Sequence, residues 1–91
     1  MAFDHINYVR SGHPDLTHRQ MAMMILIQQQ GQCTVRGLAA ELAIQKPAIT
    51  RGATTLQALG LIHRVRDITD RRNVFLVPTP DGAQFVKEAH G

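Results

Sequence analysis

The hydrophobic pattern of this chain changes its period at Gly60, and this change limits the folds that the chain can adopt. Before Gly60, apolar residues recur at i, i+3, i+4 and i+7 in residues 35–42, as on one face of a helix. After it, residues 61–66 and 73–77 are rich in β-forming residues and flank a polar turn at 67–72. The sequence therefore predicts helices followed by a two-stranded hairpin.

An earlier helix is marked by a capping-box pattern. Thr17 is followed three residues later by Gln20, so each side chain can bind a backbone N–H at the start of a helix. We expect this helix to run over residues 18–29 and to end at Gly31. Its apolar residues, within 21–27, surround more than one face, which predicts a helix packed between other elements at the centre of the core.

Similar signals order the rest of the chain. Residues 32–33 can form a short strand, and Thr34 can cap the helix that follows. Pro47 suits the first position of another helix, which Gly60 ends, and residues 79–82 are typical of the cap and first turn of a last helix. The predicted order is helix, short strand, helix, helix, strand, strand, helix.

Size and composition restrict the class of protein. The 91 residues, 44% hydrophobic and 19% charged, are enough for one domain with one core. The longest apolar run has seven residues, too few to span a bilayer, and the N-terminus lacks a signal-peptide pattern, so we expect a cytoplasmic protein without a membrane partner. The lone Cys33 cannot form an internal disulfide, and no zinc-finger spacing is present.

Positive charge is concentrated in one third of the chain. The net charge is +3 with a pI near 9.8. Residues 46–72 hold six Lys or Arg against two Asp, whereas the rest of the chain has one more acidic than basic residue. A solvated surface explains many charge runs. In the predicted helix 47–59, however, Ile49, Ala53, Leu56 and Leu59 or its neighbours should face inward, which leaves an outer face that is small, polar and cationic.

Two helices joined by a short turn, followed by a hairpin, predict a winged helix-turn-helix, an α+β fold that is mainly α. Helix 47–59 would then enter the major groove of DNA, and the two-stranded wing 64–73 the minor groove. Asp67 and Asp70 would orient Arg66 or Arg72 through ion pairs. The expected DNA-binding residues are Lys46, Pro47, Ala48, Thr50, Arg51, Thr54, Thr55, Arg64, Arg66, Arg71 and Arg72. No cofactor is expected.

The segment LAAELAIQKPAITRGATTLQALGLIHRVRDITDRRNVFLVPTPDGAQFV resembles the DNA-binding core of the MarR family of winged-helix regulators. The shared motifs are the leucine-alanine start, K-P-A-I-T-R, L-x-x-L-G-L-I, the D-x-x-D-R-R wing and T-x-x-G. The resemblance implies a bacterial repressor that reads DNA through residues 47–51 and 54–55, with Arg71 and Arg72 in the wing. Family members carry long terminal helices that interlock into a dimer. Because 1–16 forms only an arm before the domain 17–91, we expect a truncated member without these helices.

The sequence thus predicts a nucleoid-associated DNA binder. The same residues also leave open a different partner and a different oligomeric state. A winged helix can act as an adaptor or anti-repressor that binds another regulator. A homodimer is a further option, since one winged helix reads few base pairs. The apolar residues of the arm could either supply the dimer contact or cover the domain's own core; they are Phe3, Ile6, Tyr8 and Val9.

Enzymatic chemistry is not expected. The five histidines lack metal-ligand spacing, and no nucleophile has a base beside it in sequence; they are His5, His13, His18, His63 and His90. Cys33 could sense oxidation, yet a cysteine at a strand edge without a neighbouring cation more often only packs.

Overall fold

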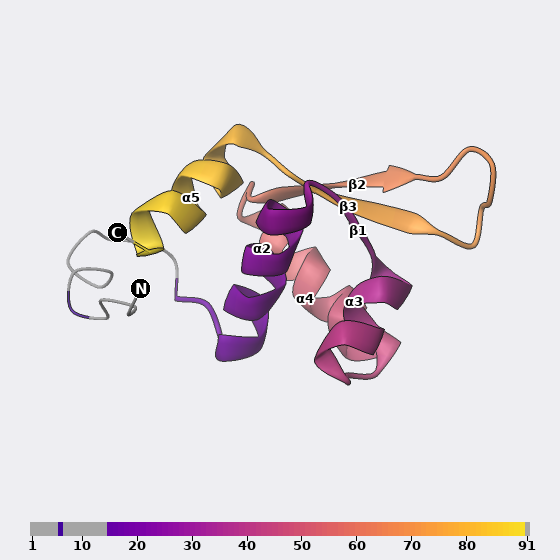
Figure 1. Cartoon of the computed structure of the whole chain (residues 1–91), viewed down its shortest axis with the longest axis horizontal. Helices are drawn as coiled ribbons and strands as arrows, with labels where there is room; N and C mark the ends of the chain where they lie inside the picture. Colours follow the sequence, from indigo (N-terminus) through magenta and orange to yellow (C-terminus); the bar gives the residue numbers. More distant parts are fainter. Residues whose placement is uncertain (1–5, 7–14, 91) are drawn as a thin grey trace.

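A computed structural model describes residue 6 and residues 15–90 of the chain. The hairpin of two strands extends away from the helices and gives the molecule its longest dimension, 42 Å against 25 and 22 Å (Figure 1). The predicted order of helices and strands is confirmed. The elements are α2 (His18–Gln30), β1 (Cys33–Thr34), α3 (Val35–Leu42), α4 (Lys46–Ala58), β2 (Ile62–Arg66), β3 (Val74–Pro78) and α5 (Pro80–His90).

Helix α2 is the central helix, as its sequence predicts. The Thr17 hydroxyl accepts a hydrogen bond from the Gln20 N–H at 3.0 Å, and the Gln20 side chain accepts one from the Thr17 N–H at 3.1 Å. Gly31 ends the helix with a φ of 79°, a left-handed value that favours glycine. The side chains of Met23 and Met24 are fully buried among α4, α5 and the sheet. None of the described helices is long and apolar enough to cross a membrane.

A tight turn joins α3 to α4. Thr34 caps α3 by accepting a hydrogen bond from the Gly37 N–H at 2.8 Å. Ala43 ends α3 in a left-handed conformation, with a φ of 54°. Pro47 stands at the start of α4, where a missing N–H costs nothing.

Of the inward positions that the pattern suggests at the end of this helix, Leu59 or its neighbours, Leu59 itself is not buried, because its side chain is 43% exposed. Helix α4 ends at Ala58, so Leu59 is its C-cap and no longer continues the buried stripe. Leu61 supplies the buried side chain instead, and its N–H donates to the carbonyl of Leu56 at 3.0 Å. Gly60, with a φ of 76°, reverses the chain between them.

The wing is part of a three-stranded antiparallel sheet in the order β1-β3-β2. Strand β3 pairs with β2 along its whole length, with Arg64 opposite Leu76, and Cys33 of β1 pairs with Leu76 from the other side. The short strand was predicted, but its pairing with β3 was not, since the two segments are far apart in sequence. Beyond Ile62, β2 is exposed, so the hairpin leaves the core at this residue.

Thr79 and Gly82 explain why the T-x-x-G motif follows the wing. The Thr79 hydroxyl donates to the Gly60 carbonyl at 2.7 Å and accepts from the Gly82 N–H at 2.9 Å, so it caps α5 and joins it to the turn after α4. A Cβ atom on Gly82 would overlap the backbone carbonyl of Leu61. The first turn of α5 therefore lies directly on the backbone that leads into β2.

Gly82→Ala should destabilise the fold, although alanine normally favours a helix over glycine by about 0.5–1 kcal/mol. The added methyl group meets rigid backbone, and we expect a loss of about 2–3 kcal/mol in the free energy of unfolding, measured by urea denaturation. Gly52→Ala is the matched control, because its Cβ would meet the flexible end of Met23, at 2.9 Å from the sulfur. An equal or smaller loss for Gly82→Ala would contradict this account.

Candidate nucleic-acid interface

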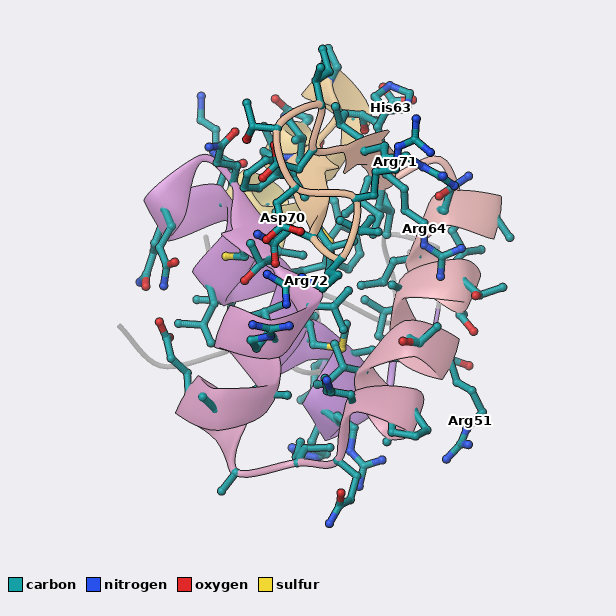
Figure 2. The ribbon with its side chains drawn as sticks, turned by 90° about the vertical axis from the view of Figure 1, so that its right-hand side faces the viewer. Arg51, His63, Arg64, Asp70, Arg71 and Arg72 are labelled. Atoms are coloured by element: carbon teal, nitrogen blue, oxygen red, sulfur yellow. The ribbon has the colours of Figure 1, made fainter. Side chains whose placement is uncertain are left out.

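In the middle of α4, residues 49–56, four exposed polar side chains form what we call its outer face: Thr50, Arg51, Thr54 and Thr55. Ile49, Ala53 and Leu56 are fully buried on the opposite side. Figure 2 shows Arg51 projecting away from the fold. Lys46 and Pro47 are also exposed, whereas Ala48 is half-buried at the edge of this face.

Arg64 links the wing to the outer face of α4. One terminal nitrogen of its guanidinium donates to the Thr50 carbonyl at 2.9 Å and to the Thr54 hydroxyl at 2.6 Å. The Thr54 hydroxyl in turn donates to the Thr50 carbonyl at 3.0 Å. Figure 2 shows Arg64 lying beside α4 rather than extending into solvent. Because Arg64 belongs to β2, these bonds set the angle between the wing and the helix.

Two aspartates order the turn of the wing, and they do so differently. Asp70 accepts hydrogen bonds from the Arg72 N–H at 3.0 Å and from its guanidinium at 3.1 and 3.2 Å, which is one of the two ion pairs that the sequence suggests. Asp67 instead accepts from the N–H and the hydroxyl of Thr69, at 2.9 and 2.7 Å. Arg66 and Arg71 are exposed on the wing, and Arg71 lies on its turn (Figure 2).

These bonds also act on the acidity of both aspartates. The hydrogen bonds from Thr69 lower the pKa of Asp67, and those from Arg72 lower the pKa of Asp70, because each partner stabilises the charged carboxylate. Both carboxylates are therefore ionised at neutral pH and neutralise part of the positive charge of the wing. Arg72 is held by Asp70, and the wing keeps a net positive charge because Arg64, Arg66, Arg71 and Arg72 outnumber the two aspartates.

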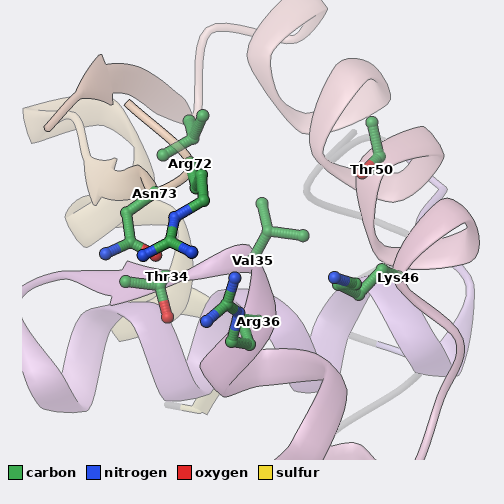
Figure 3. Close-up of a pocket in the computed structure, with 8 residues that line it drawn as sticks. Thr34, Val35, Arg36, Lys46, Thr50, Arg72 and Asn73 are labelled. Carbon is green, nitrogen blue, oxygen red and sulfur yellow. The ribbon is translucent and has the colours of Figure 1, made fainter. Parts of the chain in front are cut away.

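Two cavities flank the outer face of α4 and bring in cations that sequence reasoning missed. One, of about 200 Å³, is lined by Arg36 of α3 together with Lys46 and Arg72 (Figure 3). The other, of about 480 Å³, is lined by Arg19 of α2 together with Arg51. Arg19 and Arg36 lie outside the basic segment 46–72, so counting charges along the chain assigned them to the part with negative excess. Each is the second residue of its helix, and only the packing of α2 and α3 beside α4 brings it to these cavities.

Cys33 is buried, with 6% of its surface exposed. Its sulfur lies 3.3 Å from the Gln30 side-chain oxygen and 3.7 Å from the Leu26 carbonyl oxygen. Burial and, to a lesser degree, the nearby Glu41 raise the pKa of the thiol, so little reactive thiolate forms at neutral pH. These surroundings favour a packing role over oxidation sensing.

In the described part of the chain, no three His, Cys, Asp or Glu residues are placed to hold a metal ion.

A helix with a polar cationic outer face, a preceding helix joined by a tight turn and a hairpin fixed to the helix by Arg64 define a winged helix-turn-helix protein. The family model of the MarR family matches residues 16–74, and the chain belongs to this family.

Several relatives share this fold. The chain is 28% identical over 74 residues to the HTH-type transcriptional regulator FarR of Neisseria gonorrhoeae, a match that covers 81% of this chain and 51% of FarR. A mutant form of Lactococcus lactis ZitR superposes with a TM-score of 0.75 at 31% identity, over 82% of this chain and 51% of ZitR. The transcriptional regulator BldR from Sulfolobus solfataricus gives 0.77 at 29% identity, over 91% and 59%. The chain thus spans between half and three fifths of the length of these relatives.

Arg72→Ala should raise the pKa of Asp70 toward the value of about 3.9 for a free aspartate, measured by NMR titration of the carboxyl carbons. Asp67 is the internal control, since its main partner is Thr69. Folding lowers both pKa values. The stabilisation that the two carboxylates give the wing is therefore complete above the pKa of the unfolded state, and it is lost as the pH falls through the pKa values of the folded state. An Asp70 pKa that stays unchanged in the variant would contradict the role of the ion pair.

Proposed function

We propose that this protein is a sequence-specific DNA-binding transcriptional regulator that represses the genes whose control sites it covers. The observation that carries the proposal is the outer face of α4, which is polar, cationic and tied to the wing through Arg64. An α-helix fits a major groove about 12 Å wide, and the outer face of α4 is the solvent side of a helix whose other side is buried. Membership of the MarR family and the likeness to the regulators FarR and BldR support it.

In this proposal, residues 47–59 enter the major groove. Arg51 can bond to the two acceptors of guanine, and Thr50 offers a hydroxyl to a base or phosphate and a methyl group to thymine. Thr54 has its hydroxyl engaged by Arg64, so its role is to position the wing, and Thr55 and Lys46 contact the phosphate backbone. Ala48 and Pro47 allow the backbone of the helix to approach the DNA closely.

The wing 64–73 would read the adjacent minor groove. Arg71 stands on its turn, where an arginine can enter the narrow and electronegative groove of A·T-rich DNA. Arg66 and Arg72 would contact the backbone nearby, with Arg72 oriented by Asp70 and the turn ordered by Asp67. Arg64 would act through its hold on α4, because that hold sets the spacing between the two contacts.

Titration of DNA monitored by fluorescence anisotropy tests this function. We expect tight binding to duplex rather than single-stranded DNA, with an affinity that falls steeply as salt rises. On a duplex selected by the protein from random sequence, Arg51→Ala should cost about 1–3 kcal/mol of binding free energy and relax the sequence preference. Arg71→Ala should weaken binding as well.

Lys87→Ala is the matched control, because Lys87 is exposed on α5, which lies at the end of the molecule opposite the tip of the wing (Figure 1). Its affinity should equal that of the wild type. If the wild-type protein showed no affinity for duplex DNA at low salt, the proposed function would be wrong, and the adaptor that binds another regulator would become the better hypothesis.

We further propose that the protein binds DNA as a homodimer in the cytoplasm, at the nucleoid, with 17–91 as the DNA-binding domain and 1–16 as an arm. Two copies on half-sites one helical turn apart read more base pairs than one winged helix can. Of the apolar arm residues, Phe3, Tyr8 and Val9 lie outside the described residues, and Ile6 is exposed. Multi-angle light scattering should give twice the chain mass of 10.1 kDa, and a monomer at high concentration would contradict the dimer.

A further inference from the structure

The two cavities beside α4 lie on nearly opposite sides of the helix. Lys46 and Thr50 line the smaller one and are about 40° apart around the axis, at about 100° per residue. Ala48 and Thr55 line the larger cavity. Around the helix axis, they lie about 180° and 160° from the direction midway between Lys46 and Thr50. The exposed Thr54 lies between the two cavities on the solvent side. The outer face of α4 is therefore bordered by one cavity along each flank.

The smaller cavity gathers three cations from three elements. Arg36 comes from α3, Lys46 from α4 and Arg72 from the wing, and their charged ends approach the same space (Figure 3). Asp70 engages part of the Arg72 guanidinium, so the group retains two positive charges in excess. Thr34, also in the lining, accepts a hydrogen bond from the Gly37 N–H, which leaves its own hydroxyl hydrogen available to donate. Such a cavity fits an anion with several oxygen acceptors.

The larger cavity has the same character on the other flank. Arg19 from the first turn of α2 and Arg51 of α4 are both exposed and line it, together with Thr55. Among the residues that the structure describes, no aspartate or glutamate lines either cavity. Arginine is the side chain best suited to phosphate, because its planar donors match two oxygens of one group.

From this arrangement we infer that each cavity holds a backbone phosphate of a different DNA strand, with Arg36 and Arg19 as the contacts that sequence reasoning had not identified. An α-helix with its side chains is about 10–12 Å across and the major groove is about 12 Å wide, so a helix docked there has one sugar-phosphate strand along each flank. Phosphate contacts on both sides fix how deep and at which angle the helix lies, but they carry no sequence information. This inference rests on the proposed function.

Salt titrations of Arg36→Gln, Arg19→Gln and the double variant test the two contacts on a duplex selected by the wild type. Each single change should lower the slope of log affinity against log salt by about 0.9, and the double change by about twice as much. Between 50 and 200 mM salt, the affinity of the wild type falls by a certain factor. The factor for each single variant should be about 3.5 times smaller. The ratio of affinities for selected and random duplex should stay unchanged, as it should in the control Lys87→Gln.

Duplexes with one neutral methylphosphonate linkage at a time test the assignment to strands. Wild-type binding should weaken when a contacted linkage is neutralised in either strand. Neutralising that linkage should cost Arg36→Gln less affinity than it costs the wild type in one strand only, and Arg19→Gln less in the other strand only. If both variants lost sensitivity in the same strand, or bound like Lys87→Gln, the inference would be overturned while wild-type binding still supported the proposed function. Absence of wild-type binding to duplex DNA would overturn both.

Discussion

Complete burial of one face of α2 is the constraint on which the rest of the structure depends. Met23, Met24 and Ile27 have no exposed surface, and a chain of this size has only one core in which to bury them. Helices α4 and α5 and strand β3 all pack against this helix. Helix α4 covers this core with Ile49, Ala53 and Leu56, which are fully buried. Its polar side must therefore face solvent. The cationic outer face is thus a direct consequence of how the core is covered.

A second set of contacts fixes the wing and α5 relative to the outer face of α4. Arg64 holds the wing at α4, and Thr79 joins the start of α5 to Gly60 at the end of α4. Gly82 allows α5 to lie against the backbone before β2, so the hairpin leaves the core in one direction. Helix α4, the wing and the two flanking cavities are in this way parts of one connected arrangement rather than separate features.

The sequence predicted most of the elements because their ends depend on local chemistry. Thr17, Thr34, Pro47 and Gly31 act on the backbone within a few residues, and each does in the structure what its pattern indicates. The pattern did not settle whether Leu59 or a neighbour is buried at the end of α4, because a helical repeat does not reveal where the helix stops. The pairing of β1 with β3 was missed because a strand of two residues has no sequence signal for its partner.

The sequence by itself therefore determined the winged helix-turn-helix order, the polar side of α4 and the basic character of the wing. Each of these follows from neighbours in the chain or from the separation of apolar and polar residues. Only the tertiary structure decided that Arg64 binds α4 and that Asp67 accepts hydrogen bonds from Thr69 rather than from an arginine. It also decided that Arg19 and Arg36 lie on the two flanks of α4. These relations join side chains from different elements, and their distances are set by packing around α2, which no local pattern records.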